Sequence, residues 1–321
     1  MTSAVNSEIQ RAVQALQRGE LVGMPTETVY GLAGDARNET AIRAIFARKR
    51  RPPDHPLIVH LHSAEQLLEW AVAPNKLALK LAQQFWPGPL TLILNKSAEV
   101  SLLLTGGQSS IGVRVPAHPV ARELLRVFGG ALAAPSANRF GHISPTKAAH
   151  VREEFGNELL ILEGGASAIG IESTIVDART LRPKILRPGA ISEAEIMRCA
   201  AEFSEITNEL NAEVTQSPTI RVSGALASHY APRTPCKLVQ ALPEGAQSSL
   251  TIAVLALDNL PSGFLGTALP SNPAAYAFGL YHALRHLDAL EVRQILIQAP
   301  PKYEAWIAIW DRLSRACSVA E

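Results

Sequence analysis

The chain has 321 residues, of which 47% are hydrophobic and 18% are charged, and its formal net charge is +1. That length predicts about two domains, at roughly 150 residues each, and the abundance of aliphatic residues excludes a disordered chain. The near-neutral charge argues against a dedicated nucleic-acid binder, which usually carries a basic excess. No apolar run reaches the about 18 to 20 residues that span a bilayer, and no signal peptide is evident, so we expect a soluble, cytoplasmic protein.

The three cysteines, Cys199, Cys236 and Cys317, are odd in number and far apart in the sequence. Such spacing predicts neither a disulfide framework nor a CxxC metal site. We therefore expect no metal ion held by protein side chains alone.

The first part of the chain alternates between predicted helices and strands. Helices are predicted where apolar residues recur at helical spacing, and strands where short aliphatic runs occur between turn residues. The predicted helices cover residues 7–19, 38–50, 75–85, 118–128, 144–155 and 192–203. The predicted strands cover residues 21–25, 57–61, 90–94, 111–116, 131–137, 159–165 and 173–178. Several strands follow one another after short turns, which favours a three-layer α/β domain with a mixed sheet.

The pattern changes after about residue 205. Residues 206–235 are polar and contain several prolines without clean periodicity, which predicts a linker. Strands at 236–242, 251–257 and 292–299, with helices at 272–290 and 303–316, predict a smaller Rossmann-like βαβ domain. The predicted organisation is a first domain at 1–205, a linker at 206–235 and a second domain at 236–321.

The densest motif is PTETVYGLAGDA, residues 25–36. It places two threonine hydroxyls and a carboxylate on a turn that leaves a strand, where loops on a rigid sheet commonly hold ligands. The alternative is an ordinary capped turn with Thr26 as the N-cap of a helix, because Ser and Thr often serve there.

A basic run, Arg48 to Arg51, stands at a predicted helix end before two prolines. It predicts either a clamp for a polyphosphate, because guanidinium groups bind phosphate oxygens in pairs, or cations that complement the helix dipole. From these residues alone the two interpretations carry equal weight.

A third motif, Ser144-Pro145-Thr146, has the pattern of a helix start, with Ser144 as N-cap and Pro145 at the first helical position. A helix N-terminus favours anions, although an ordinary cap is the commoner meaning of this tripeptide. With ESTIVD and Arg187, these hydroxyls and cations form a set suited to a nucleotide. The chain contains no GxxxxGK[ST], GxSxG or HExxH motif, which excludes a P-loop ATPase and argues against two common hydrolase classes.

Read in order, the motifs carry a family resemblance. They are PTETVYGL, Lys49-x-Arg51-Pro52 with HPLIVHL, FWPGPLTLIL, GVRVP, APSAN followed by SPT, ESTIVD, LRPG and SHYAP. Together they resemble the L-threonylcarbamoyladenylate synthase family of the two-domain type, in which a linker joins a YrdC-like domain to a smaller C-terminal domain. The resemblance covers essentially the whole chain.

The resemblance implies a reaction and its partners. Members of the family join L-threonine, bicarbonate or CO2, and ATP into threonylcarbamoyl-AMP and release pyrophosphate, with Mg²⁺ accompanying the ATP. Partner proteins then transfer the threonylcarbamoyl group to an adenosine in tRNAs that read codons beginning with A. Tight direct nucleic-acid binding is not expected.

The resemblance also assigns residues by position. Positions that hold threonine correspond here to Thr28, His60, Arg114, Ala134 and Ser173. Positions around ATP correspond to Lys49, Arg51, His55, Ser110, Ser136, Asn138, Ser144 and Arg187, of which Lys49 and Arg51 are also predicted to be catalytic.

Three positions depart from common family patterns. His55 and Ser110 stand where some relatives have Asn and Thr, but both can form hydrogen bonds. Ala134 replaces a hydroxyl residue, so only a backbone contact is expected there.

The linker carries its own prediction. It contains His229-Tyr230-Ala231-Pro232, although a segment that only spans two domains needs no aromatic residue. We predict that it folds back over the first domain and closes the nucleotide pocket, with Tyr230 near ATP. The alternative is that Tyr230 packs the linker onto the second domain.

Two other functions compete with this synthase. An RNA-binding or ribosome-assembly factor would use the basic run, but the charge of +1 and the 5% of aromatic residues disfavour it. A carbamoyl-adenylate-forming module of hydrogenase maturation would carry CxxC pairs, which this chain lacks.

Overall fold

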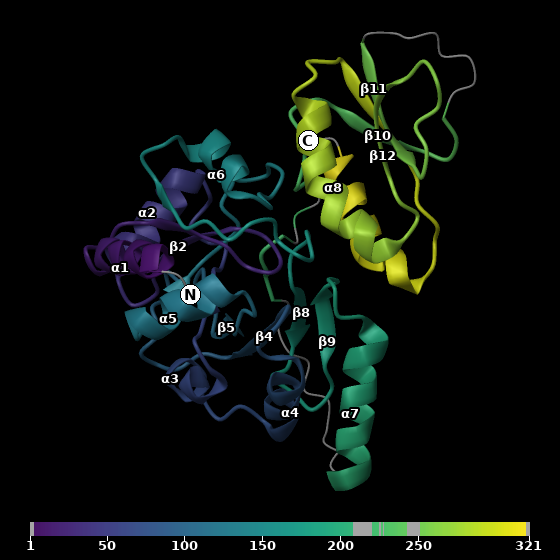
Figure 1. Ribbon diagram of the computed structural model, residues 1–321. Helices are drawn as coiled ribbons and strands as arrows, with labels where there is room; N and C mark the ends of the chain where they lie inside the picture. Colours follow the sequence, from purple (N-terminus) through teal and green to yellow (C-terminus); the bar gives the residue numbers. More distant parts are fainter. Residues whose placement is uncertain (1–2, 208–219, 225, 227, 243–250, 319–321) are drawn as a thin grey trace.

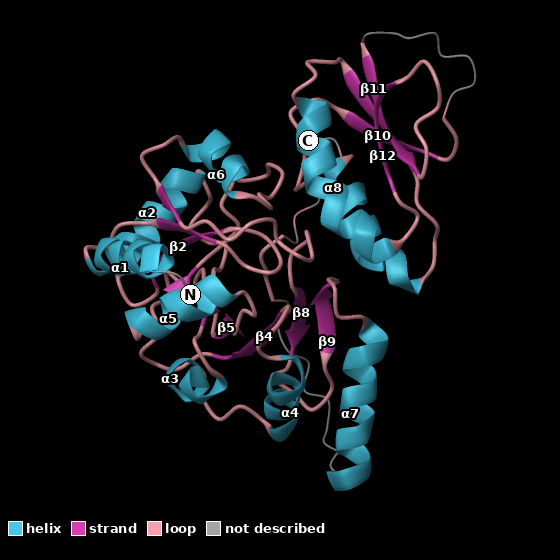
Figure 2. Ribbon diagram, viewed as in Figure 1, coloured by secondary structure: helices cyan, strands magenta, loops and turns pink. Residues whose placement is uncertain are grey.

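The computed structural model describes residues 3–207, 220–224, 226, 228–242 and 251–318. Two β-sheets lie in two parts of the chain, a nine-stranded sheet in the N-terminal unit (residues 3–207) and a four-stranded sheet in the C-terminal unit (the described residues from 236 onward) (Figures 1 and 2). Among these described residues, no helix is both long enough and apolar enough to cross a bilayer.

The nine-stranded sheet is mixed, with the strand order β7-β1-β2-β6-β3-β5-β4-β8-β9. Parallel pairs such as β3–β5 and β4–β8 occur beside antiparallel pairs such as β1–β2 and β4–β5. The strands are β1 (Val22–Met24), β2 (Gly31–Asp35), β3 (Ile58–His60), β4 (Leu90–Asn95), β5 (Ser110–Arg114), β6 (Leu132–Ala133), β7 (Leu160–Ile161), β8 (Thr174–Asp177) and β9 (Lys184–Arg187).

Apolar cores lie on both faces of this sheet. Successive side chains of a strand point to opposite faces, so on β2 Leu32 joins the core of α2 and α4 while Ala33 joins the core of α1 and α5. The helices are α1 (Ser3–Gln17), α2 (Glu39–Lys49), α3 (Leu67–Trp70), α4 (Lys76–Phe85), α5 (Pro119–Phe128), α6 (Ala148–Phe155) and α7 (Glu193–Thr207), with a short 3-10 turn at Ala64–Gln66. The predicted three-layer, mixed α/β architecture is confirmed.

The C-terminal unit is a parallel sheet with the strand order β10-β13-β11-β12. Its strands are β10 (Cys236–Val239), β11 (Ile252–Leu257), β12 (Leu265–Leu269) and β13 (Gln294–Gln298). Helices α8 (Pro273–Asp288) and α9 (Ile307–Ala316) bury Leu284 and Leu313 in one core with Leu255 of β11, and a 3-10 turn at Glu304–Trp306 precedes α9. This confirms the predicted Rossmann-like βαβ character of the unit.

Three strands, β2, β9 and β12, occur where the sequence pattern predicts none. Helix α6 also begins at Ala148, so the prediction that Ser144 caps it is wrong. The physical reason is the carbonyl of Pro145, which accepts a hydrogen bond from the backbone N–H of Tyr30 at 2.8 Å. That pairing holds residues 144–146 in a loop beside the start of β2.

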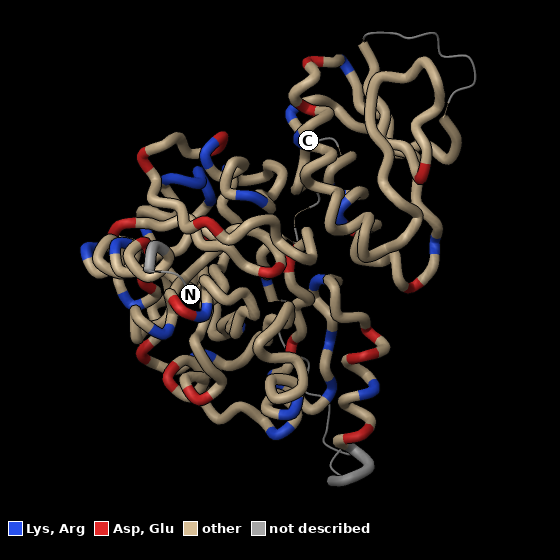
Figure 3. The backbone as a smooth tube through the Cα atoms, viewed as in Figure 1, with Lys and Arg blue, Asp and Glu red and all other residues tan. Residues whose placement is uncertain are grey.

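The described part of the linker contacts both units, because Thr234 and His229 bond to Asp288 and Arg315 of the C-terminal unit while other residues bond to the N-terminal unit. The N–H of Ala231 donates to the carbonyl of Gly141 at 2.9 Å, and the guanidinium of Arg221 donates to the carbonyl of Gly106 at 2.7 Å. Residues 208–219 of the predicted linker lie outside the described residues, and the predicted domain boundaries stay predictions. Charges of both signs are interspersed along both units (Figure 3).

Candidate active site

A small polar pocket of about 40 Å³ lies in the N-terminal unit and is covered by the linker. Its walls come from the ends of β3, β5 and β9, the turn after β1 and the loop before β8. The predicted residues that line it are Thr28, His60, Arg114, Ala134, Ser136, Ser173, Arg187 and Tyr230. The predicted residues outside this lining are Lys49, Arg51, His55, Ser110, Asn138 and Ser144.

The turn after β1 is organised by the hydroxyl of Thr26. Its oxygen accepts the N–H groups of Thr28 at 3.3 Å and Val29 at 3.2 Å, and it lies 2.9 Å from the hydroxyl oxygen of Thr28. Thr26 therefore closes this turn and does not cap a helix. The arrangement places the buried Thr28 side chain in the pocket wall.

Arg114, at the end of β5, is the buried cation beside this turn. Its guanidinium donates to the hydroxyl of Thr28 at 2.9 Å, to the carboxylate of Glu27 at 2.6 Å and to the carbonyl of Gly88 at 3.1 Å. Burial disfavours the charged carboxylate, but Arg114 outweighs that effect and lowers the pKa of Glu27. A guanidinium has five N–H donors, so two remain for a carboxylate that enters the pocket.

His60 and Ala134 line the pocket beside this guanidinium, because His60 on β3 pairs in register with Arg114 on β5. Burial, and then the charge of Arg114, lowers the pKa of His60 to about 3, so its imidazole is neutral at physiological pH. Its Nδ1 atom has no hydrogen-bond partner. The N–H of Ala134 donates to the carbonyl of Ile58 at 3.1 Å, which leaves only its carbonyl for a ligand, as its lack of a polar side chain predicts.

Lys49, the last residue of α2, is buried behind the pocket. Its ammonium group donates to the carbonyls of Ser136 and Asn138, each at 2.6 Å. Burial, followed by the charge of Arg51, lowers the pKa of Lys49 well below its usual value. The lysine therefore braces the loop after β6 that carries both residues.

The four cations of the basic run diverge in space. Arg50 is exposed and has a left-handed backbone conformation with φ of 53°, which turns the chain at the end of α2. Arg51 then points inward, where it donates to the carbonyl of Pro56 at 2.9 Å, and burial lowers its pKa to about 10. Arg48 instead donates to the carbonyl of Phe155 at 3.1 Å. Of the four cations, only Lys49 and Arg51 are buried, and neither lines the pocket itself.

Arg187, at the end of β9, brings a third buried cation to the pocket. It donates to the hydroxyl of Ser173 at 3.0 Å and to the carbonyl of Ser173 at 2.9 Å. Its other terminal nitrogen donates to the carbonyl of Ser223 in the linker at 3.0 Å. The ESTIVD and LRPG motifs are thus in direct contact in the structure.

Three other predicted residues lie at the periphery. The ring of His55 packs edge-on against Phe140, with the two ring centres 5.1 Å apart. Ser110 lines a separate cavity of about 10 Å³, which Ser223 also lines. Asn138 donates its side-chain N–H to the carbonyl of His142 at 2.8 Å, while its Oδ1 is buried without a partner.

Ser144 leads to a residue that received no role from the sequence. Its hydroxyl donates to the carboxylate of Glu172 at 2.5 Å, and Glu172 lines the pocket. The same carboxylate receives Tyr281 and Arg312 from the C-terminal unit. Glu172 belongs to the ESTIVD motif, so the sequence contained a signal that could have assigned it to the site. No local sequence pattern marks Tyr281 or Arg312.

The linker supplies Ser223, His229 and Tyr230 to the pocket wall. Tyr230 is 1% exposed, its φ is 61°, and its hydroxyl has no hydrogen-bond partner. A Cβ added to Gly224 would lie 2.0 Å from this hydroxyl, so only glycine fits there. Tyr230 also packs with Tyr281 in the apolar core of the C-terminal unit, which is the alternative to closure over ATP, and the closure itself stays a prediction.

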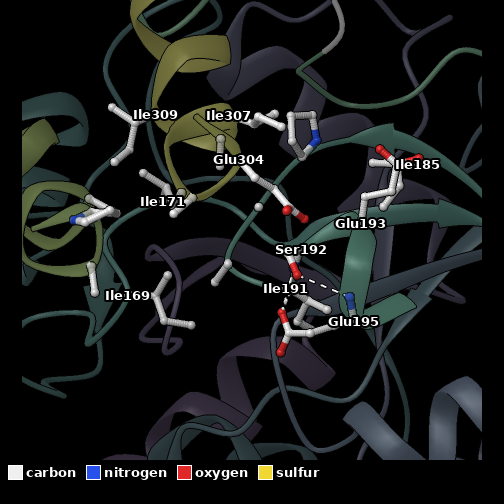
Figure 4. Close-up of a pocket in the computed structure, with 18 of the residues that line it drawn as sticks. Ile169, Ile171, Ile185, Ile191, Ser192, Glu193, Glu195, Glu304, Ile307 and Ile309 are labelled. Carbon is white, nitrogen blue, oxygen red and sulfur yellow. Dashed lines mark hydrogen bonds between the residues drawn. The ribbon is translucent and has the colours of Figure 1, made fainter. Parts of the chain in front are cut away.

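A larger cavity, of about 590 Å³, lies between the two units and contains none of the predicted residues. Its walls are apolar, with Ile171, Ile185 and Ile309 among them, and Glu193 and Glu304 also line it (Figure 4). This lining includes no cation that could bind a phosphate. The small polar pocket is therefore the candidate active site.

Comparison with known proteins places the whole chain in one family. The family model described as "Telomere recombination" (Sua5, YciO and YrdC) matches residues 14–189, and the model for the C-terminal domain of threonylcarbamoyl-AMP synthase matches residues 191–318. Threonylcarbamoyl-AMP synthase of Pyrococcus abyssi is 36% identical over 96% of this chain and 94% of its own length. The synthase of Bacillus subtilis is 34% identical over 98% of this chain and 94% of its own length.

The solved structures agree with the sequence comparisons. The crystal structure of P. abyssi Sua5 complexed with L-threonine has a TM-score of 0.83 and 34% identity, and it covers 96% of this chain and 94% of the solved chain. Both units and the linker between them thus have counterparts in a single known protein. On these matches, the chain belongs to the threonylcarbamoyl-AMP synthase family of enzymes.

Proposed function

We propose that this chain joins L-threonine, bicarbonate or CO2, and ATP into L-threonylcarbamoyl-AMP, with release of pyrophosphate. The observation that carries the proposal is the union of two kinds of recognition in one pocket. Arg114 and Thr28 suit an amino acid, whereas Arg187 in the same pocket and Arg51 outside its lining are buried cations suited to phosphates. The names of the P. abyssi and B. subtilis relatives support the same reaction.

In this proposal L-threonine binds beside the turn after β1. Its carboxylate takes the two free N–H groups of Arg114, and polar contacts come from Thr28, His60, Ser173 and the carbonyl of Ala134. The P. abyssi structure complexed with L-threonine supports this choice of amino acid. His60 is neutral, so it does not add a second positive charge that would attract the threonine carboxylate away from Arg114.

ATP binds on the side of the cations. Arg51 and Arg187 contact phosphates directly, and Lys49 holds the loop of Ser136 and Asn138 in place. His55, Ser110, Ser144 and Tyr230 lie around the nucleotide. Within the described ranges no group of three or more His, Cys, Asp or Glu residues could hold a metal ion, so we propose that Mg²⁺ enters on the ATP phosphates.

The reaction then needs no covalent enzyme intermediate. The amine of threonine adds to CO2 and forms a carbamate, and one carbamate oxygen attacks the α-phosphorus of ATP. The new O–P bond replaces the bond to pyrophosphate, which leaves with the electron pair. Lys49 and Arg51 supply positive charge and position, which are the main catalytic needs of such a transfer.

The linker acts as a lid in this scheme. Ser223, His229 and Tyr230 cover the pocket and exclude water, which protects the carbamate and the mixed anhydride from hydrolysis. We propose that the two units and the linker divide at 205/206 and 235/236. We expect Tyr230→Ala to lower turnover several-fold, while Tyr303→Ala, which changes an exposed tyrosine, leaves it unchanged. A Tyr230 variant that loses only melting temperature would assign the residue to packing.

The product is a labile activated compound, so we propose that partner proteins consume it by transferring the threonylcarbamoyl group to tRNA. The test of the main proposal is pyrophosphate release from Mg-ATP, with the product identified by mass spectrometry. We expect release only when L-threonine and bicarbonate are both present. An RNA-binding factor would show no such dependence, and that result would remove the proposal.

A further inference from the structure

The carboxylate of Glu172 joins the two units at a buried point beside the candidate active site. It accepts hydrogen bonds from the hydroxyl of Ser144 at 2.5 Å, the phenol of Tyr281 at 2.9 Å and the guanidinium of Arg312 at 2.8 Å. Ser144 and Glu172 belong to the N-terminal unit, whereas Tyr281 lies on α8 and Arg312 on α9. These four residues are called the Glu172 cluster below.

The cluster is balanced in charge. The Arg312 side chain is 0% exposed and the Glu172 side chain is 7% exposed. Burial raises the pKa of a carboxyl, but Arg312 and then Arg187 outweigh it and lower the pKa of Glu172 to about 2. Arg312 also pairs with Asp311 at 2.6 Å. Without Arg312 the buried carboxylate would keep only the more distant charge of Arg187, in the wall of a pocket whose proposed ligand carries a triphosphate, and like charges repel strongly at low dielectric.

The same two residues of the C-terminal unit also hold the linker. The guanidinium carbon of Arg312 lies 5.1 Å from the ring centre of Tyr230, and the ring of Tyr281 stacks on Tyr230 with centres 5.9 Å apart. Arg312 and Tyr281 therefore contact both Glu172 and Tyr230, which line the pocket.

A second contact between the units serves as a contrast. Arg285 of α8 donates to the carboxylates of Glu153 at 3.3 Å and Glu154 at 3.0 Å on α6. Its guanidinium also donates to the carbonyl of Ile143, which precedes Ser144, but it bonds to neither the Glu172 carboxylate nor Tyr230. Arg285 therefore controls for the docking of the two units without a direct contact to Glu172.

We propose that Arg312 and Tyr281 are positioning residues of the active site, supplied by the C-terminal unit. Both residues fix the Glu172 carboxylate in the position where it binds Ser144. Arg312 also neutralises the charge of that carboxylate toward the triphosphate. Both residues hold Tyr230 at the pocket wall. This inference rests on the proposed function, because it takes ATP as the ligand. It gives the C-terminal unit a defined task in a reaction whose predicted substrate-binding residues all lie in the N-terminal unit and the linker.

The test compares Arg312→Met, Arg312→Lys, Tyr281→Phe and Arg285→Met in steady-state pyrophosphate release, at a temperature where each variant is folded. We expect Arg312→Met to raise the KM for ATP about tenfold and the KM for threonine much less. Tyr281→Phe should also raise the KM for ATP, but by a smaller factor. Arg312→Lys should give a KM for ATP between those of the wild type and Arg312→Met. Arg285→Met should leave both KM values unchanged.

A charge-removal double variant separates positioning from packing. Glu172→Gln added to Arg312→Met removes the unpaired anion, so we expect the KM for ATP to return toward the wild-type value. The proposal is overturned if Arg312→Met and Arg285→Met change only melting temperature and do so alike, or if the double variant is no better than Arg312→Met. If the wild-type enzyme itself makes no threonylcarbamoyl-AMP, the proposed function fails instead, and the two failures are thereby distinguishable.

Discussion

The two cavities that flank residues 171–173 differ in size and in chemistry. Ile171 lines the cavity of about 590 Å³ between the units, whereas Glu172 and Ser173 line the pocket of about 40 Å³ under the linker. The larger cavity is mainly apolar, and the smaller one gathers Arg114, Arg187 and a neutral histidine. The linker residues Ser223, His229 and Tyr230 form part of the wall of the smaller one. Cavity volume would favour the larger cavity, whereas the hydrogen-bond donors and charges favour the smaller pocket as the candidate active site.

The largest effect should come from removing a cation on the polar side. Arg51→Ala loses charge-assisted contacts to phosphate, each worth about 1.5 to 3 kcal/mol, so ATP use should fall roughly ten- to a hundredfold with little change in threonine affinity. Pyrophosphate release as a function of ATP concentration measures this. Arg50→Ala, which removes an exposed cation next to it, is the matched control. Equal kinetics in both variants would reduce the basic run to charges at a helix end.

The polar pocket should also respond to pH. Burial lowers the pKa of His60 and of His229 from 6.5 to about 3. Below pH 6.5 the unfolded chain therefore binds more protons than the folded chain, and stability falls as pH decreases from 6.5 toward 3, by about 1.4 kcal/mol per pH unit for each histidine. Denaturant unfolding at pH 7.5 and 5.5 measures the loss. A His60→Gln variant should lose less unfolding free energy between these two pH values than the wild type. If its loss equals that of the wild type, His60 is not buried as a neutral group.

A smaller effect is expected at the threonine side. Thr28→Val keeps the shape of the side chain and removes one hydroxyl, which accepts from Arg114. The loss of one hydrogen bond, about 0.5 to 1.5 kcal/mol, should weaken threonine binding roughly two- to tenfold while the fold survives. Calorimetric titration with threonine gives the affinity directly. Binding as tight as in the wild type would place Thr28 outside the threonine site.

The apolar cavity should show the opposite behaviour. Ile309→Val removes one methylene from a residue that is 1% exposed, which should cost about 0.5 to 1.5 kcal/mol of stability. Turnover and both KM values should stay at the wild-type level. Thermal unfolding and pyrophosphate release on one preparation test the two statements together. A change in kinetics larger than the change in stability would give the large cavity a part in the reaction.

Much of the architecture follows from local patterns. Helix α5 matches its predicted range within one residue, because His118 and Pro119 start it and Gly129, with φ of 75°, ends it. Strand β2 was missed because Gly31 and Gly34 have low strand propensity, and the strand exists only because β1 and β6 pair with it on both sides. Such pairing depends on tertiary structure, which a local pattern does not contain.

The site shows the same division. The ordered motifs led to Arg114, Ser173 and Arg187, which the structure brings into one pocket. Ser144 was assigned to a helix start, but its hydroxyl is bound to Glu172, 28 positions later in the sequence. The contact of Arg312 with Glu172 joins residues 140 positions apart, and on α9 Arg312 stands beside the buried Leu313 with no pattern that marks it. Contacts between domains are set by how the domains dock, so motif analysis could not supply them.

The covered pocket has a kinetic consequence. A volume of about 40 Å³ is far below the roughly 300 to 1,000 Å³ of typical small-molecule sites. In the proposed lid arrangement, substrates enter, and threonylcarbamoyl-AMP leaves, when Ser223, His229 and Tyr230 move away from the N-terminal unit. Every catalytic cycle includes at least one such displacement, so its frequency sets an upper bound on the turnover number. The contacts that shelter the reactive anhydride from water also delay its delivery to the next protein.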